Sequence, residues 1–456
     1  MKHELNTLHE DTIVSIATAV SNNAISIIRL SGTDSLKIAS KIFTKDLTKV
    51  KSHTIHYGYI KEKDDVIDEV LVSVFLSPKS FTCENTVEIN CHGGVFVTNK
   101  VLEMLLENGA RMAYPGEFTK RAFLNGRIDL TQAEAIMDMI ESNTNNSLKL
   151  ASLGLTGKTK ELIKNFREKV LQIILKIEVN IDYPEYEDEE QITNTTLIPN
   201  IKSLLEDMDD VIDKSEVSQV IKNGIKTAII GKPNVGKSSL LNSLLREEKA
   251  IVTNIAGTTR DIVEGELNIG GLVLKLIDTA GIRITDDVVE KIGVEKSIKT
   301  INEAELVILV LDNNEELSES DIELLEITKD KNRIIVVNKK DLKPKLDYSI
   351  LGDYLLISTY ADEDIFKLQN KIKEICKVND IKNIDNTYIG NARQISKLKL
   401  ARYHLQEALN SLYNNFPIDI SNIDINMAWV CLGEIMGDVS SDDLLDELFS
   451  RFCLGK

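Results

Sequence analysis

The segment Gly231-Lys232-Pro233-Asn234-Val235-Gly236-Lys237-Ser238 decides the fold of the chain around it. It has the phosphate-binding pattern G-x-x-x-x-G-K-[ST]. The apolar run 226–230 before it predicts a buried strand, and residues 239–245 after it predict an amphipathic helix. A loop in this context presents backbone N–H groups at a helix N-terminus, where the helix dipole favours anions. The sequence therefore predicts an α/β P-loop domain.

The residue types in this loop match the groups of a nucleoside triphosphate with Mg²⁺. Gly231 and Gly236 permit a tight backbone turn around the phosphates. Lys237 is expected to reach the outer phosphates, and Ser238 offers a hydroxyl to Mg²⁺.

Two later motifs indicate which base is bound. Asp278-Thr279-Ala280-Gly281 follows the apolar run 272–277, so Asp278 is expected at a strand end facing the pocket, where its carboxylate can hold Mg²⁺ directly or through water. Asn338-Lys339-Lys340-Asp341 follows the apolar run 334–337. A carboxylate such as Asp341 can accept two hydrogen bonds from guanine N1–H and its amino group, which adenine does not offer. The motifs together predict a GTPase.

The composition restricts the class of protein. The chain has 456 residues, is 43% hydrophobic and carries a net charge of −18. This acidity disfavours indiscriminate nucleic-acid binding, so an RNA partner would need a local basic patch or a second protein that supplies positive charge. No run of about 18 apolar residues and no signal-peptide pattern occurs. The five cysteines lack a C-x-x-C pair, and we expect a cytoplasmic protein without a membrane segment or zinc site.

The pattern of apolar residues changes along the chain and predicts a multidomain protein. Residues 1–125 alternate short apolar runs with turns, which is typical of an α+β domain. Residues 126–223 and 379–456 have helical periodicity, and residues 224–378 contain the P-loop motifs. We therefore expect an all-α helical domain in two parts, with a Ras-like α/β G domain inserted between them.

Motifs outside the G domain carry a resemblance to a known family. The chain resembles, over its whole length, the tRNA uridine-modifying GTPases of the MnmE or TrmE family. The matching segments are Arg29-Leu30-Ser31-Gly32, Val87-Glu88-Ile89-Asn90-Cys91-His92-Gly93-Gly94, Pro115-Gly116-Glu117-Phe118-Thr119, Arg121-Ala122-Phe123-Leu124-Asn125-Gly126, Asp129-Leu130-Thr131-Gln132-Ala133-Glu134-Ala135, Gly257-Thr258-Thr259-Arg260-Asp261 and Phe452-Cys453-Leu454-Gly455-Lys456.

The resemblance implies an activity, cofactors and partners. It implies a homodimer whose N-terminal domain, residues 1–125, dimerises and binds tetrahydrofolate carrying a one-carbon unit as a 5-formyl or methylene group. It also implies GTP, Mg²⁺ and K⁺ in the G domain. With a flavoprotein partner of the MnmG or GidA family, forming a heterotetramer, such proteins add an aminomethyl or carboxymethylaminomethyl group at C5 of the wobble uridine of certain tRNAs.

The resemblance also assigns roles to individual residues. Asn234, Thr253, Ile255 and Thr258 would hold K⁺, and Thr259 would join Ser238 on Mg²⁺. Glu290 would orient the attacking water, because Ile282 stands where small GTPases have a catalytic Gln. Arg283 would be a second switch residue. Arg29, Glu88, Arg127 and Lys456 would contact the folate, and Cys453 would take part in the modification. The nucleotide site would comprise Asn234, Val235, Gly236, Lys237, Ser238, Ser239, Thr253, Asn254, Ile255, Ala256, Gly257, Thr258, Thr259, Asp278, Thr279, Ala280, Gly281, Asn338, Lys339, Lys340, Asp341, Ser358, Thr359 and Tyr360.

Simpler interpretations of these residues stay open at this stage. Glu290 can merely favour a helix N-terminus, the charged folate-site residues can be surface charges, and Cys453 can be a small apolar filler. Ser21-Asn22-Asn23 and Ser358-Thr359-Tyr360 depart from the family pattern in the first folate-side loop and beside the guanine base. The alternative functions are a GTP-switched ribosome-assembly protein, which predicts a basic RNA-binding extension, and a regulatory binding protein that takes no folate.

Overall fold

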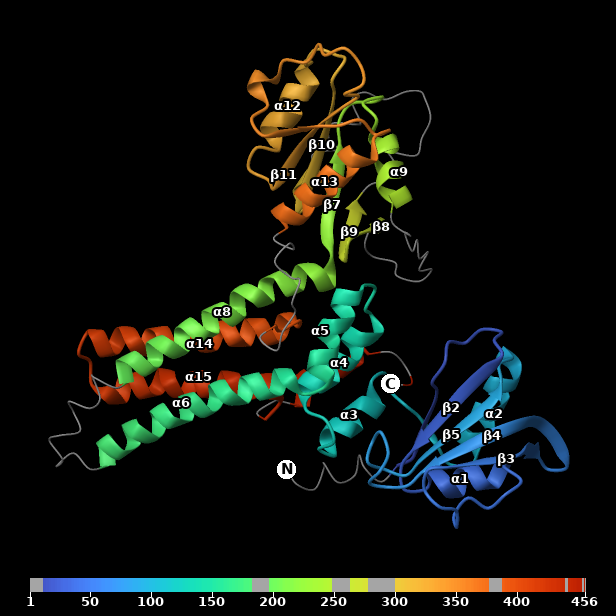
Figure 1. The fold of residues 1–456 in the computed structure, drawn as a ribbon. Helices are drawn as coiled ribbons and strands as arrows, with labels where there is room; N and C mark the ends of the chain where they lie inside the picture. The colour runs from blue at the N-terminus through green and yellow to red at the C-terminus, as the bar shows by residue number, and fades with distance from the viewer. Residues whose placement is uncertain are drawn as a thin grey trace. The chain divides into compact units, whose positions relative to one another are not determined.

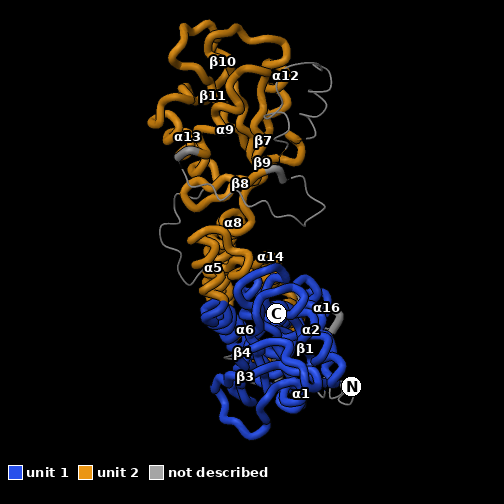
Figure 2. Tube along the Cα trace, turned by 90° about the vertical axis from the view of Figure 1, so that its right-hand side faces the viewer, with its two compact units in different colours: residues 1–137, 155–172, 425–456 blue, residues 138–154, 173–424 orange. Residues whose placement is uncertain are grey.

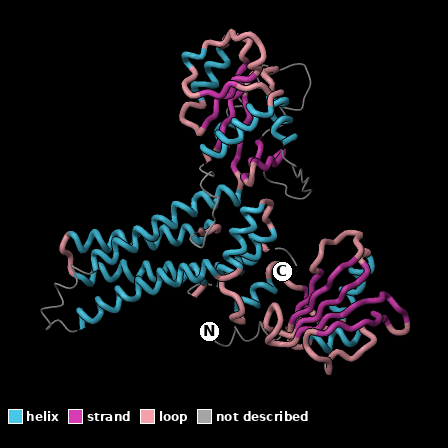
Figure 3. The backbone as a smooth tube through the Cα atoms, in the orientation of Figure 1, coloured by secondary structure: helices cyan, strands magenta, loops and turns pink. Residues whose placement is uncertain are grey.

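The chain is described by a computed structural model that covers residues 11–182, 197–247, 263–277, 300–376, 388–438, 442–452 and 455. It divides into two compact units (Figure 2). Unit 1 comprises residues 1–137, 155–172 and 425–456, and unit 2 comprises residues 138–154 and 173–424. Among the described residues, each unit contains one six-stranded sheet, and the remaining regular structure is helical (Figure 3).

The sheet of unit 1 has the strand order β3-β4-β5-β2-β1-β6 (Figure 1). Its neighbouring strands are antiparallel except for β1 and β6, which are parallel. The strands are β1 (Ile13–Ile16), β2 (Ile25–Ser31), β3 (Thr54–Glu62), β4 (Asp65–Phe75), β5 (Thr86–His92) and β6 (Arg111–Met112).

Helices cover one face of this sheet, and the alternation of side chains explains which face. Along β2, Ile28 and Leu30 are fully buried against α1 (Ser35–Ile42) and α2 (Val95–Glu107). Arg29 lies between them and points to the opposite face, because successive side chains of a strand alternate. Glu88 of β5 is the register partner of Arg29, so the two charged residues share the face that these helices leave uncovered.

The C-terminal part of unit 1 packs against the segment that follows its sheet. Helix α16 (Asp442–Ser450) lies against α3 (Glu117–Leu124), where Phe449 and Phe452 join Ala122 in one buried apolar cluster. Further along, a Cβ on Gly455 would lie 2.5 Å from the carbonyl oxygen of Ile16. The end of the chain therefore returns to the N-terminal sheet.

Long helices make up the middle of the chain. In unit 2, α8 and α14 lie side by side and are joined by an ion pair between Arg402 and Asp209 (Figure 1). Among the described residues, no helix combines the length and apolar character needed to cross a membrane. The helices of this region are α4 (Leu130–Ile140), α5 (Asn145–Leu155), α6 (Lys158–Asp182), α8 (Ile198–Asn223), α14 (Ala392–Tyr413) and α15 (Ile418–Met436).

The sheet of unit 2 has the order β12-β11-β10-β7-β9-β8, in which only the edge strand β8 is antiparallel to its neighbour. All seven residues of β10 are buried, as expected for a parallel strand with helices on both faces. The strands are β7 (Ile225–Ile230), β8 (Val263–Ile269), β9 (Leu272–Ile277), β10 (Leu306–Asp312), β11 (Arg333–Asn338) and β12 (Tyr354–Leu356).

Helices of this G domain cover both faces of its sheet. Apolar residues of α9 (Lys237–Glu247) and α13 (Asp362–Ile375) pack on one face, and Leu325 of α12 (Glu319–Ile327) packs on the other. A short 3₁₀ turn, η3 (Tyr348–Ile350), precedes β12. Strand β7 lies between β9 and β10, so the loop after it opens at the point where the strand order reverses, which is where such sheets bind ligands. The multidomain fold class predicted from the sequence, with an α+β part, a helical part and an inserted α/β P-loop domain, is confirmed.

Candidate functional site

The P-loop joins β7 to α9 and needs glycine at two positions. Gly231 has φ +145°, and a Cβ there would lie 2.2 Å from the carbonyl oxygen of Val310. Gly236 has φ +99°, and a Cβ there would lie 2.2 Å from Nδ2 of Asn338. Asn234 also has a positive φ, of +64°, which asparagine tolerates better than most residues. The loop backbone is therefore shaped by residues that accept left-handed conformations.

Lys237 begins α9 and points back across the loop. Its Nζ donates to the carbonyl oxygens of Gly231, at 2.7 Å, and Lys232, at 2.5 Å. Burial lowers the pKa of Lys237, because a desolvated ammonium group loses hydration. Within the described parts of the chain, no carboxylate pairs with this ammonium group. Phosphate oxygens would supply the missing counter-charge, and the neighbouring exposed Ser238 and Ser239 lie in the first turn of α9, where anions are favoured.

Asn338 connects the base-side motif to the P-loop. It ends β11, is 1% exposed, and its Nδ2 donates to the carbonyl oxygen of Val235 at 2.9 Å. Its Oδ1 is buried and accepts no hydrogen bond from the described residues. Lys339 has φ +64° and its Nζ pairs with Asp312 at 2.5 Å, at the end of the neighbouring strand β10. The motif is thereby fixed against both the P-loop and β10.

Asp341 presents its carboxylate at the same edge of the sheet. Its Oδ1 accepts a hydrogen bond of 2.8 Å from Oγ of Ser358, which follows β12. Lys340 forms an ion pair with Asp364 of α13 instead of facing Asp341. The carbonyl of Thr359 accepts a hydrogen bond from Ser243 of α9, and the side chain of Tyr360 is 87% exposed. The structure therefore brings Asp341, Ser358 and the P-loop together around one edge, with Tyr360 open to solvent.

Several predicted site residues lie outside the described residues. They include the whole segment from Thr253 to Thr259 and the motif from Asp278 to Gly281, which begins directly after the end of β9 at Ile277. Arg283, Glu290, Cys453 and Lys456 also lie outside. Their roles stay predictions.

A second group of predicted residues meets in unit 1. Nε of Arg29 donates to Oε1 of Glu88 at 2.8 Å, and both side chains are about one-fifth exposed, at 20% and 22%. Nη1 of Arg29 donates to the carbonyl oxygen of Gly455 at 3.3 Å, which places the residue before Lys456 beside this pair. Arg127 is a third charged group near this pair, because it shares the ring of Phe81 with Arg29. The guanidinium carbon of Arg127 is 4.9 Å from the ring centroid of Phe81, and that of Arg29 is 6.0 Å from it.

Comparison with known proteins identifies the family. Residues 12–127 match the family described as GTP-binding protein TrmE N-terminus, and residues 130–453 match the MnmE helical domain. A tRNA modification GTPase MnmE from Lactococcus lactis subsp. cremoris is 50% identical over 448 residues, covering 98% of both chains. The chain belongs to the MnmE family. Similar relatives carrying the same name occur in Streptococcus agalactiae, at 49% identity over 451 residues covering 98% of both chains, and in Acholeplasma laidlawii, at 50% over 447 residues covering 98% of this chain and 99% of the relative.

This chain is a GTPase, an enzyme that hydrolyses GTP: its MnmE-family relatives carry that name, and its P-loop geometry is consistent with the activity. The resemblance stated from the sequence motifs is confirmed.

Sequence reasoning missed a buried charge network next to the second site of this MnmE-family chain. The side chain of Arg121 is only 3% exposed, and its guanidinium pairs with Asp11 at 2.5 Å, Glu117 at 3.0 Å and Glu84 at 3.3 Å. Burial by itself would raise the pKa of Glu117, but hydrogen bonds from Arg111, Tyr114 N and Arg121 outweigh burial and hold that pKa below its ordinary value. No sequence pattern distinguishes these charges from surface charges, although three of them occur in family motifs or beside them.

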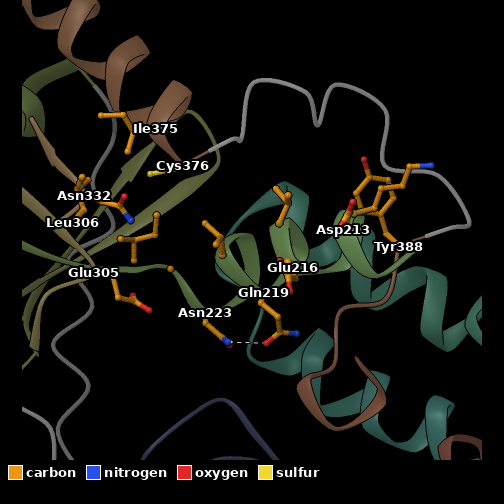
Figure 4. A pocket seen from close by; sticks show the side chains of 15 residues that line it. Asp213, Glu216, Gln219, Asn223, Glu305, Leu306, Asn332, Ile375, Cys376 and Tyr388 are labelled. Carbon is orange, nitrogen blue, oxygen red and sulfur yellow. Dashed lines mark hydrogen bonds between the residues drawn. The ribbon is translucent and has the colours of Figure 1, made fainter. Parts of the chain in front are cut away.

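A cavity of about 850 Å³ lies elsewhere in unit 2 (Figure 4). Gln219 and Asn223 of α8 line one side, and Glu305, Leu306 and Cys376 line the other. It opens at the start of β10, whereas the P-loop follows the carboxyl end of β7, so this cavity is separate from the nucleotide site. Burial, with a smaller effect of Glu305, raises the pKa of the Cys376 thiol to about 11, which leaves it protonated and unreactive at neutral pH.

Proposed function

We propose that this chain couples GTP hydrolysis to modification of tRNA, adding an aminomethyl or carboxymethylaminomethyl group at C5 of the wobble uridine together with a flavoprotein of the MnmG or GidA family. The observation that carries the proposal is that one chain contains both a P-loop joined to a base-side motif and a second charged site, at which Gly455, the residue before Lys456, meets Arg29. The full-length relatives are named tRNA modification GTPases. A tRNA substrate also favours the cytoplasmic location expected from the sequence.

The G domain would hold GTP with Mg²⁺. The donor set fits: a buried ammonium group at Lys237, a hydroxyl at Ser238 and a helix N-terminus, all at the carboxyl edge of a parallel sheet. Mg²⁺ held there would neutralise charge on the phosphate oxygens. Asp341, held by Ser358, would accept hydrogen bonds from the guanine edge, and Asn338 would keep the base-side motif in register with the P-loop.

Hydrolysis would depend on K⁺, because the chain has Ile282 where a water-orienting Gln would stand. Asn234 fits a cation ligand: it is exposed in the P-loop, and its amide offers a hard oxygen donor. K⁺ would supply positive charge beside the phosphates when the G domains of two chains meet. Thr253, Ile255 and Thr258 would complete its ligands, Thr259 would join Mg²⁺, and Glu290 would orient water.

The second site would bind the one-carbon tetrahydrofolate, which supplies the carbon unit when bound. The groups fit this ligand: the Glu88 carboxylate can pair with the donor edge of a pterin, while guanidinium groups suit the carboxylates of a glutamate tail. The position of Gly455 beside Arg29 supports a role for Lys456, and for Cys453 in the modification itself.

A homodimer would bury an exposed apolar face of unit 1. Ile55, Tyr57 and Leu71 are 68%, 50% and 46% exposed on the face of the sheet opposite α1 and α2. Tyr57 and Leu71 are register partners, so they form one patch. A second copy of the chain would remove this apolar area from water, which favours association.

GTP hydrolysis measured in K⁺ and in Na⁺ at equal ionic strength tests the proposal. We expect strong stimulation by K⁺ that disappears in Asn234→Ala. Asn415→Ala is the matched control, because Asn415 also has a positive φ, of +51°, but lies in the exposed turn after α14. Equal rates in both salts would contradict cation activation and favour the alternative of a GTP-switched assembly or regulatory protein that awaits another activator.

A further inference from the structure

Phe81 occupies a central position in the second site. It lies in the loop between β4 and β5 and is partly buried. Its ring packs against two apolar clusters, one containing Phe449 and Phe452 from the C-terminal segment and one containing Ile13 and Phe118. The ring therefore sits where the N-terminal sheet, α3 and the returning C-terminal segment meet.

The same ring is shared by two guanidinium groups. Arg29 lies 6.0 Å from its centroid and is also neutralised by Glu88. Arg127 lies closer, at 4.9 Å, and its Nη1 donates to the carbonyl oxygen of Phe81 at 3.0 Å. In the described parts of the chain, no carboxylate pairs with Arg127. Phe81 thus fixes Arg127 through both its ring and its backbone, while the charge of Arg127 stays available to a ligand.

The loop that carries Phe81 is itself held in place. Oγ1 of Thr82 lies 2.6 Å from Oγ of Ser31, and the carbonyl of Thr82 accepts a hydrogen bond of 2.7 Å from Asn125. Glu84, two residues further on, pairs with the buried guanidinium of Arg121. These contacts hold the loop rigidly, because each anchors it to a different part of the chain: β2, α3 and the segment after α3. The ring of Phe81 is therefore held in a fixed position.

We propose that Phe81 is a positioning residue of the folate site, whose aromatic ring orients Arg127 toward the carboxylates of the ligand's glutamate tail. The inference rests on the proposed folate function. A cation held over an aromatic face keeps its charge and loses only part of its freedom, so less entropy is lost when it then binds a carboxylate. Phe81 would thereby favour anionic, glutamate-bearing folates over the pterin alone.

The test measures binding of 5-formyltetrahydrofolate to the full chain by calorimetry. Phe81→Leu keeps an apolar side chain in both clusters but removes the aromatic face. We expect it to weaken folate binding about 2- to 5-fold, as for the loss of one exposed cation–π contact with its orientation. Phe81→Tyr should bind as the wild type does. Phe123→Leu is the matched control, because Phe123 packs against the same cluster as Phe81 but no cation of the described residues lies over its ring.

Two further comparisons separate positioning from mere support of the fold. Binding of 6-methyltetrahydropterin, which lacks the tail, should be unchanged in Phe81→Leu. In an Arg127→Ala background, Phe81→Leu should change folate affinity less than about 2-fold, because the coupled partner is already gone. Equal losses for both ligands, or an undiminished loss without Arg127, would overturn the proposal.

The outcomes also distinguish this inference from the function on which it rests. If the wild-type chain binds no folate, the proposed folate site fails and the role of Phe81 fails with it. If the wild type binds folate and Phe81→Leu binds equally well, only the role of Phe81 is overturned. Should Phe81→Leu fail to fold, judged by its thermal unfolding and GTP hydrolysis, Phe81→Met is measured in its place with the same expectations, because methionine fills the site flexibly without a ring face.

Discussion

Replacing Gly236 by alanine should disrupt the nucleotide site by displacing the side chain of Asn338. The new Cβ would lie 2.2 Å from Nδ2 of Asn338, where an ordinary contact begins at 3.4 Å. Asn338 would have to move by about 1 Å. That movement breaks its 2.9 Å hydrogen bond to the carbonyl of Val235 and separates the base-side motif from the P-loop.

The size of the effect follows from two contributions. Leaving buried polar groups without their hydrogen bond costs about 1–3 kcal/mol. Holding alanine at φ +99° adds about 1–2 kcal/mol. The sum of about 2–5 kcal/mol corresponds to a loss of GTP affinity of about 30-fold or more, because each 1.4 kcal/mol is a factor of ten.

Titration of a fluorescent GTP analogue, with thermal unfolding alongside, measures this loss. Gly352→Ala is the control: Gly352 has φ +70°, but a Cβ there would have no atom of the described residues within 4 Å, so it carries the backbone cost without the clash. It precedes β12 and thus lies away from the nucleotide edge. A difference in GTP affinity of less than about 3-fold between Gly236→Ala and Gly352→Ala would be within the usual variation of such effects. That result would refute the inference that Asn338 joins the two motifs.

Three further predictions concern charge. Arg121→Met should lower the stability of unit 1 by about 3–5 kcal/mol, measured by denaturant unfolding, because it leaves buried carboxylates unpaired; a loss under about 1 kcal/mol would contradict this. The pKa of Glu117 is depressed in the folded state, so this carboxylate contributes stability that is fully present above about pH 4.3 and is lost as the pH falls through the folded pKa. Glu117→Gln should therefore flatten the acid side of a plot of unfolding free energy against pH. An unchanged plot would argue against this role. Asp341→Asn should change the preferred nucleotide from GTP to XTP, because the amide of asparagine can donate to the extra carbonyl of xanthine. A variant that still prefers GTP would show that Asp341 does not contact the base.

The elements of the G domain were predictable because each lies between strong local signals. The strand before Gly231 and the helix from Lys237 follow from an apolar run, a glycine-bounded loop and an amphipathic period. The strand that ends at Asn338 is a continuous apolar run, as expected for a strand buried on both faces. The family motifs likewise selected Arg29 and Glu88, which the structure places in contact.

Contacts between distant segments were not predictable from the sequence. Phe81 and Arg127 are 46 positions apart, and nothing local shows that they meet. Arg121 resembles a solvated helix charge, because arginine is seldom buried. Its burial depends on Asp11 and Glu84, which reach it from other segments and join Glu117 of its own helix. Asn338 was assigned to the base, but its tie to Val235 depends on the strand order, which periodicity does not specify.

Formation of the C5-modified uridine tests the central claim most directly. Purified chain, flavoprotein partner, unmodified tRNA and one-carbon tetrahydrofolate are combined with either GTP or a non-hydrolysable analogue, and the tRNA nucleosides are quantified by mass spectrometry. We expect modified wobble uridine with GTP and none with the analogue or with Lys237→Ala. Equal modification with and without hydrolysable GTP would contradict the coupling of GTP hydrolysis to tRNA modification.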